Sequence, residues 1–309
     1  IFHNLHLFAN PIDKFRPSDK EIQRALKKKK GSNLIYFGPG VHNLPNDTLF
    51  VPSGTTVYID GGARVYGNIF TEGAHDVNIF GRGEVHPDGR GAGVWVRRSK
   101  NVRIDGIVVS QLPIGQCDSV ELTNVKSISY YGWGDGMDVF SSSNVILDGV
   151  FCRNSDDCAA VYASTQGFKG GSNNVLVKNA TLWADVAHPI NIGGHGDPNG
   201  MDTVQNVTFR NIDILDQAEK QIDYQGCLAI NPGDNTLVRN ITFENIRIED
   251  FRNGQLVNFR ISFNPKYCVS TGRGIQNVLV KDVTYNGSGE NLSIIAGYDE
   301  NHKISGIRV

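Results

Sequence analysis

A short sequence signature recurs along most of the chain: Asn, Asp or Ser, then Val, then alternating polar and aliphatic residues. Clear copies begin at residues 76, 101, 119, 144, 174, 206, 240 and 277, and residues 302–309 begin a further one. The spacing between copies is 18 to 37 residues and lengthens toward the C-terminus. Repeats of this period are typical of solenoids, in which each coil buries its apolar face against the next.

The residues between the signatures favour strands and turns over helices. Val, Ile, Leu and Phe alternate with polar residues, as in strands that are half buried against a common core. The chain also contains 35 Gly and 29 Asn among 309 residues, and both residue types favour turns. Leucine-rich repeats need a regular Leu spacing, and propellers need blades of about 40 residues; the spacing of the copies in this chain fits neither. We therefore predict an all-β fold, a right-handed parallel β-helix.

The first 33 residues differ from the rest. Ser18 to Glu21 form a capping box, and apolar residues at helical spacing follow. We predict one short helix at 18–30, ending in a lysine run before Gly31, that caps the open end of the stack. The expected organisation is a single domain, with an N-terminal segment and capping helix at 1–33 and a β-helix at 34–309.

Charge and composition exclude several classes of protein. The formal net charge is −2, and we find no basic stripe interleaved with aromatic residues, so we expect no nucleic-acid partner. The apolar runs are too short for a transmembrane helix. The five Cys include no CxxC pair, so the sequence predicts no zinc site. Because the chain begins at Ile1 without a charged leader, we expect any signal peptide to be already removed.

Polar residues recur at one position of successive coils. Asp135, Asp157 and His188 each lie four residues before an aliphatic residue of a predicted strand. Neighbouring strands lie about 4.8 Å apart, so we expect these side chains to form one column, with Asp156 beside Asp157. Gln255 holds the equivalent position on a later coil.

Three carboxyl groups on two neighbouring coils suit acid–base chemistry. Like charges at such separation raise the pKa of at least one group, which leaves an acid beside ionised partners. Glycoside hydrolysis needs such a pair of carboxyl groups. Two alternatives stay open: the acidic column could hold a hard divalent cation, or the protein could bind carbohydrate without turnover.

Further residues near this column are candidates for contacts with a sugar. Trp133 and Tyr162 offer aromatic faces, although both residue types also serve ordinary packing. His195 lies in a glycine-rich loop, and His188 precedes Pro189. We expect Asp138 to belong to a turn.

Four motifs together resemble known glycoside hydrolases: Gly134-Asp135-Gly136, Ser155-Asp156-Asp157, Gly194-His195-Gly196 and Arg260-Ile261. They look like the polygalacturonases of glycoside hydrolase family 28. The stretches 34–41, 181–183 and 189–193 look more like the dextranases and isopullulanases of family 49. Both families are right-handed parallel β-helices that hydrolyse with inversion, without a cofactor or metal.

The resemblance implies roles for individual residues. Asp156 would be the general acid, and Asp135 and Asp157 would activate water. Because strand alternation points neighbouring side chains to opposite faces, a bend at 156–157 is needed for both to reach one cleft. His195, His188, Trp133, Arg260, Gln255 and Tyr162 would contact substrate.

Two departures from family 28 affect the expected substrate. Trp133 replaces a usual Asn, and Ser262 replaces the lysine that would pair a uronate carboxylate. We therefore expect a secreted or periplasmic enzyme that cleaves an α-linked glucan similar to dextran or pullulan. The alternatives are a polygalacturonase-like hydrolase of pectic polysaccharide and a non-catalytic carbohydrate-binding β-helix. The sequence does not define the oligomeric state.

Overall fold

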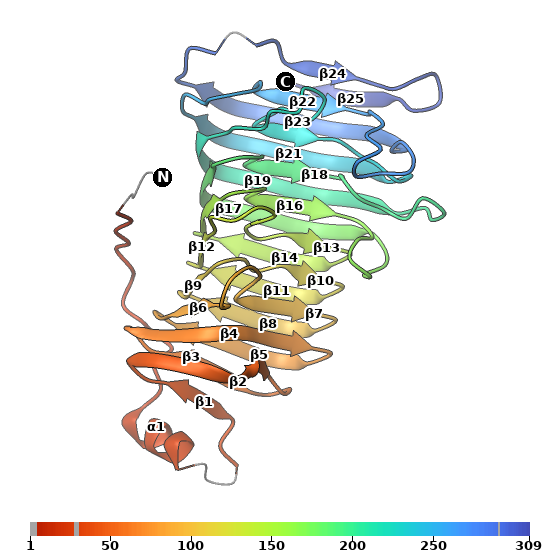
Figure 1. The fold of residues 1–309 in the computed structure, drawn as a ribbon. Helices are drawn as coiled ribbons and strands as arrows, with labels where there is room; N and C mark the ends of the chain where they lie inside the picture. The colour runs from red at the N-terminus through yellow and green to blue at the C-terminus, as the bar shows by residue number, and fades with distance from the viewer. Residues whose placement is uncertain (1–4, 28–30, 290) are drawn as a thin grey trace.

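The computed structural model describes residues 5–27, 31–289 and 291–309. Within them, 25 strands join into one continuous sheet, and each successive coil stacks on the previous one by parallel pairing (Figure 1). The fold is a right-handed parallel β-helix, as the repeat predicts. Three strips of parallel strands, which we call the first, second and third faces, surround the core.

The first face carries the repeated signature and extends along the whole stack. Its strands are β1 (Leu34–Phe37), β3 (Thr56–Ile59), β5 (His75–Gly81), β8 (Lys100–Asp105), β11 (Asp118–Thr123), β14 (Ser143–Asp148), the first halves of β17 (Ser172–Ala184), β19 (Thr203–Asp216), β21 (Leu237–Ile248) and β23 (Gly274–Tyr285), and β25 (Ile304–Arg308). The expected last copy of the repeat at 302–309 is therefore confirmed as a strand.

The second face follows directly along the chain. Its strands are the first halves of β2 (Gly40–Phe50) and β4 (Ala63–Glu72), then β6 (Glu84–His86), β9 (Val108–Val109), β12 (Lys126–Ile128), β15 (Phe151–Asn154), and the second halves of β17, β19, β21 and β23.

The third face holds short strands between long loops. It consists of the ends of β2 and β4, then β7 (Val94–Arg97), β10 (Ile114–Gly115), β13 (Val139–Phe140), β16 (Ala159–Tyr162), β18 (Ile190–Ile192), β20 (Leu228–Ile230), β22 (Val257–Arg260) and β24 (Ile294–Ala296).

The repeated signature sets the bends of each coil. Its first residue has a positive φ in all eight copies, from Asp76 at 56° to Asn277 at 55°. The residue five positions later also has a positive φ, for example 56° at Asn211 and 84° at Gly106. Asn, Asp and Gly tolerate this left-handed conformation better than other residues. The signature is therefore a pair of bend residues that flank one inward-facing strand.

Side-chain hydrogen bonds join the bends of neighbouring coils. The Asn206 Nδ2 donates to Asn173 Oδ1 at 2.8 Å, and the Asn240 Nδ2 donates to Asn206 Oδ1 at 3.0 Å. A second such ladder links Asn211 to Asn179 at 2.7 Å. The ladders satisfy the polar groups that the bends expose and hold the coils in register.

The core lies inside the three faces and is almost wholly apolar. Aromatic rings stack in it, and Phe243 lies 5.8 Å from Phe209 on the previous coil and 5.8 Å from Phe259 on its own coil, measured between ring centroids. All five Cys are buried free thiols. Since the stacked strands supply the stability, the loops of the third face can hold the residues of a functional site.

The N-terminal helix is shorter than predicted. It is α1 (Asp19–Leu26), capped by Ser18 and Glu21 in the expected capping box, and it packs against β1 at the end of the stack (Figure 1). Lys27 already has C-cap geometry, so the helix ends before the lysine run. Residues 28–30 of the prediction lie outside the described residues.

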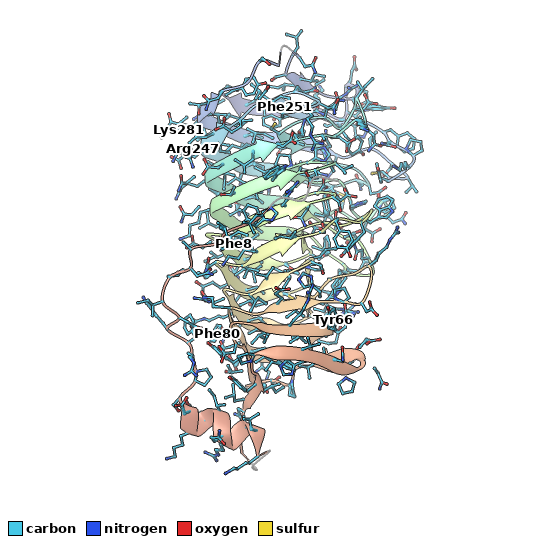
Figure 2. All side chains as sticks on the ribbon, turned by 60° about the vertical axis from the view of Figure 1, so that its left-hand side comes forward. Phe8, Tyr66, Phe80, Arg247, Phe251 and Lys281 are labelled. Carbon is cyan, nitrogen blue, oxygen red and sulfur yellow. The ribbon has the colours of Figure 1, made fainter. Side chains whose placement is uncertain are left out.

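The segment before α1 runs along the outside of the stack. Phe8 packs edge-on against Phe151 at 5.1 Å, and Phe15 stacks on Phe80 at 4.2 Å. Figure 2 labels Phe8 and Phe80. These contacts fasten residues 5–17 across several coils. Among the described residues, no helix has the length and apolar character needed to cross a membrane.

Candidate active site

The strand register brings the expected polar column together. Asp135, Asp157 and His188 precede three residues that pair in register on adjacent coils of the third face, namely Val139, Val161 and Ile192. Backbone bonds continue the alignment, because the amide of Gly136 donates to the Asp157 carbonyl at 2.7 Å. The column predicted from the sequence is therefore confirmed as a feature of the fold.

These residues open into one cavity of about 280 Å³ on the third face. The loop between β19 and β20 and the loop after β22 form part of its wall. Its acidic residues are Asp135, Asp138, Asp156, Asp157 and Glu219, and its other lining residues include Trp133, Phe140, Tyr162, His188, Asn191, His195, Gln221, Tyr224 and Tyr267.

The predicted bend at the paired acids is present. β15 ends at Asn154, β16 begins at Ala159, and the backbone bends between them. Because strand alternation is interrupted there, Asp156 and Asp157 both line the cavity.

Both oxygens of the Asp157 carboxylate accept hydrogen bonds from neighbouring groups. Its Oδ1 accepts hydrogen bonds from the His188 Nδ1 at 2.7 Å and from the His188 amide at 3.1 Å. Its Oδ2 accepts from the Tyr162 hydroxyl at 2.7 Å and from the Asn191 Nδ2 at 2.8 Å. Burial acts to raise the pKa of Asp157, but the charge of His188 and these donors outweigh burial and lower the pKa to about 2.

The other carboxyl groups shift in the opposite direction. Burial, followed by the charge of Asp157, raises the pKa of Asp156 to about 7. Burial and the charges of Asp156 and Asp157 also raise the pKa of Asp135. Carboxyl groups that repel one another in this way retain protons at mild pH. The cavity therefore combines an ionised Asp157 with neighbours that hold protons, which is the division that acid–base catalysis uses.

Asp138 is a correction to the sequence analysis, which placed it in a turn. It lines the cavity and is only 4% exposed, immediately before β13. Its position follows from strand alternation, because Val139 faces the core and its neighbours face outward. Burial and the charges of Asp135 and Asp157 raise its pKa. Asn191 occupies an outward position for the same reason, and its neighbours Ile190 and Ile192 face the core.

Four of the predicted substrate-binding residues line the cavity. Trp133 is 64% exposed, and its ring lies edge-on to Tyr267 at 6.5 Å. His195 meets the Tyr162 ring edge-on at 5.0 Å, and burial lowers the pKa of His195. Tyr162 and His188 serve mainly as partners of Asp157.

Two predicted residues, Arg260 and Gln255, lie outside the cavity. Arg260 lines a separate hollow and forms an ion pair with Asp223 at 2.8 Å. Gln255 is only 4% exposed and does not line the cavity. A register position fixes a residue's height on the stack, but the loop path decides where the side chain points. Neither side chain lines this cavity, and a contact with substrate stays a prediction for both.

Further lining residues come from the loops and were not predicted from the sequence. Glu219, Gln221 and Tyr224 precede β20, and Tyr267 follows β22. These residues lie on the longest coils, whose loops carry no repeat. Only the loop length near the acidic column could have drawn attention to them.

The cavity continues along the stack toward the earlier coils. A neighbouring hollow of about 490 Å³ shares Trp133, Asp135, Asp138 and Phe140 with it and reaches Trp95. The two hollows form a surface groove across several coils. Among the described residues, no group of three or more His, Cys, Asp or Glu side chains has a geometry suited to a metal ion.

The fold and the acidic groove together define a parallel β-helix with a groove lined by carboxyl groups on its third face. The family description "Glycosyl hydrolases family 28" matches residues 83–309, and the chain belongs to this family. The expectation of a closer relationship to family 49 is not supported, because the match is to family 28.

Individual relatives agree with this membership. The chain is 26% identical to a polygalacturonase of Juniperus ashei over 295 residues, which cover 84% of the chain and 54% of the relative. It is 24% identical to an exopolygalacturonase of Cochliobolus carbonum, over 68% of the chain and 52% of the relative. The chain thus spans about half the length of these curated relatives.

A solved structure has the same fold. The family 28 exopolygalacturonase of Yersinia enterocolitica superposes with a TM-score of 0.73 at 16% identity, and the match covers 92% of the chain and 65% of that protein.

Proposed function

We propose that this chain hydrolyses a pectic polysaccharide of the polygalacturonate class, with inversion at the anomeric carbon. The observation that carries the proposal is the cluster of Asp135, Asp156 and Asp157 in one groove of a family 28 β-helix. The relatives named polygalacturonase favour this substrate over the α-glucan expected first.

The roles follow from the protonation state of each carboxyl group and from the lone pairs that its hydrogen bonds leave open. Asp156, with a pKa of about 7, is the general acid that donates its proton to the leaving glycosidic oxygen. Asp135 faces the same cavity and is the carboxylate that takes a proton from the attacking water. Both carboxyl groups have a raised pKa, and the state that matches these roles is the one in which Asp156 keeps its proton and Asp135 has lost its own.

The groove also offers a cation for an acidic sugar. Lys266 is exposed at its edge, with its Nζ 4.7 Å from the Tyr267 ring centroid and 5.7 Å from that of Trp133. Its hydrogen bond to Tyr267, the charge of Tyr267 and then the charges of Glu219 and Asp156 raise its pKa. An ammonium above two aromatic faces can pair a uronate carboxylate while the rings contact the sugar. Lys266 therefore offers the positive charge that Ser262 does not supply.

The deciding experiment is a substrate panel with reducing-sugar readout. Polygalacturonate, pectins of graded methyl esterification, dextran and pullulan are compared, and proton NMR follows the first anomer released. Turnover of polygalacturonate with inversion supports the proposal. Turnover of a glucan alone, or release of the retained anomer, contradicts it.

A non-catalytic carbohydrate-binding protein is the alternative from a different class. It predicts binding of oligogalacturonate by calorimetry without release of reducing ends at any pH. Since polymeric pectin is extracellular material, the proposed function also implies a secreted or periplasmic protein.

A further inference from the structure

The loops on either side of the third-face strands form the two banks of the groove. Trp133 lies on the loop between β12 and β13, and Gln221 lies on the loop between β19 and β20, so both belong to the bank that precedes the strands. Tyr267 lies on the loop 261–273 between β22 and β23, on the opposite bank. Contacts of Tyr267 with the other two residues therefore cross the groove.

Tyr267 contacts the opposite bank at three points. Its ring lies edge-on to Trp133 at 6.5 Å and tilted against Tyr224 at 5.6 Å, measured between ring centroids. Its hydroxyl accepts a hydrogen bond from the Gln221 Nε2 at 3.1 Å. Since Trp133, Gln221 and Tyr267 all line the cavity that holds the acids, we call these three residues the bridge.

The loop that carries Tyr267 is fastened to its own bank. The Cys268 thiol donates a hydrogen bond to the Gly194 carbonyl at 3.3 Å. The Asp234 carboxylate accepts hydrogen bonds from the amides of Val269 and Ser270, at 2.7 and 3.2 Å. Gly194 and Asp234 belong to two earlier coils, so the loop leans back over the stack and is held there at two points. The bridge is therefore anchored to the folded stack.

The groove continues on one side of the bridge and stops on the other. Toward the earlier coils, the cavity shares Trp133, Asp135 and Asp138 with the hollow that reaches Trp95. Toward the later coils, the next hollow is the one that Arg260 lines, and among the described residues it shares none with the cavity. The acidic cavity thus opens toward one end of the stack.

A wall of paired polar groups separates the cavity from the Arg260 hollow. Tyr224 lines the cavity, and its neighbour Asp223 lines the Arg260 hollow, so the backbone runs between the two spaces. Asp223 forms the ion pair with Arg260 at 2.8 Å, and its carbonyl accepts a hydrogen bond from the Asn258 Nδ2 at 3.1 Å. A polysaccharide passing this point would have to break these pairs and leave buried polar groups without partners.

We propose that the loop 261–273 makes the groove a blind cleft that receives a chain end, so that the protein removes short products of fixed length from the end of a polysaccharide. The inference rests on the proposed function and deepens it, because it assigns an exo mode of cleavage to the same acids. A bond inside a polymer has chain on both sides, and this groove has room for a long chain on one side.

The size of the cavity agrees with this mode. Its volume of about 280 Å³ lies just below the range of about 300–1,000 Å³ that small-molecule pockets occupy, so the closed part holds about one or two sugar residues. Lys266 lies at the bridge, with its Nζ 4.7 Å from the Tyr267 ring centroid and 5.7 Å from that of Trp133. Its charge is therefore placed to meet the uronate that occupies the closed end.

The first test asks whether the bridge is closed in solution. Nuclear Overhauser spectra of wild-type protein labelled in Trp and Tyr report contact between the rings of Trp133 and Tyr267, and the spectrum of Trp133→Phe assigns the signal. We expect a cross peak between the two rings. Its absence overturns the proposal. Because this measurement needs no substrate, it applies whatever polysaccharide the protein cleaves.

The second test follows the products of wild-type cleavage of polygalacturonate by viscometry, reducing ends and chromatography. We expect one short product from the earliest times, and a viscosity that falls in proportion to the bonds cut. An early ladder of intermediate lengths overturns the exo mode and leaves the proposed hydrolase function standing. Turnover of a glucan alone contradicts the proposed function, and the product pattern on that glucan then decides the mode. Absence of turnover on every polymer overturns both.

The third test opens the bridge. Tyr267→Ala removes the ring that covers the cavity, so a chain can leave past Tyr224. We expect products longer than the wild-type product, and a loss of viscosity per bond cut that rises about fivefold. Gln221→Ala breaks only the hydrogen bond across the groove, and we expect a smaller change in the same direction.

Tyr130→Ala is the matched control. Tyr130 is 87% exposed on the loop that carries Trp133, and it lines neither the cavity nor the neighbouring hollow. We expect its products to match those of the wild type. A single short product from both Tyr267→Ala and Gln221→Ala overturns the proposal.

Discussion

Replacing Asp156 by Asn removes one proton from the groove and leaves the size of the side chain unchanged. A carboxyl group with the ordinary pKa of 3.8 would be about 2% protonated at pH 5.5, whereas a pKa of about 7 leaves about 97% protonated. The cavity thus increases the amount of acid form roughly fifty-fold at this pH. Since Asp156 works in its protonated form, wild-type activity should fall as the pH rises through about 7.

Loss of a general acid typically lowers the rate by about 10² to 10⁴. We expect kcat of Asp156→Asn on polygalacturonate to fall within that range, with KM within about threefold of the wild type. The alkaline limb of the pH profile should disappear from the residual activity. Stopped assays of reducing ends between pH 4 and 9 measure both effects.

The leaving group separates the acid from the base. An aryl galacturonide with a nitrophenol leaving group needs little protonation, so Asp156→Asn should stay within about tenfold of the wild type on it. Asp135→Asn should lose activity on both substrates, because water still has to be deprotonated. Residual activity above a tenth on polygalacturonate, or an unchanged alkaline limb, would refute the assignment of Asp156.

Three further predictions concern charge and the stack. Lys266→Gln should raise KM for polygalacturonate about tenfold at low salt, with a smaller effect on methyl-esterified pectin; Lys281→Gln, which breaks an outer-surface ion pair with Glu244, is the control, and equal KM changes in both variants would contradict the role of Lys266. Asn206→Ala should lower the free energy of unfolding by about 1–2 kcal/mol in urea titrations, because Ala strains the φ of 56° and the ladder bonds are lost. Asn206→Gly should recover the backbone part, and equal losses in the two variants would mean that strain contributes nothing. His188→Gln should lower the melting temperature most between about pH 4 and 6.5. The raised pKa of His188 stabilises the fold fully below pH 6.5, and this contribution is lost as the pH rises through about 9. The lowered pKa of Asp157 stabilises the fold above pH 3.8, and this contribution is lost as the pH falls through about 2. A deficit that grows above pH 9 would contradict the ion pair.

The repeat made the fold predictable because each signature encodes its own geometry. A residue that tolerates positive φ, an inward Val and a second bend residue define one coil, and stacking needs only that each coil repeat them. The same period predicted that Asp135, Asp157 and His188 would share a column, because parallel pairing keeps equivalent residues at equivalent positions. Asp138 was expected in a turn, but it lines the cavity because side chains alternate along the strand and Val139 faces the core.

The walls of the groove follow no such rule. Glu219, Tyr224, Lys266 and Tyr267 lie on loops whose length is visible in the sequence but whose path depends on packing between coils.

The sequence by itself therefore determined the solenoid and the height of its acidic residues, because period and bend chemistry act locally. Only the tertiary structure decided that Arg260 turns to Asp223, that His188 is enclosed between two acceptors, and that Asp157 has no free lone pair. These outcomes depend on which groups from distant coils exclude water together, and burial of that kind is a property of the assembled stack.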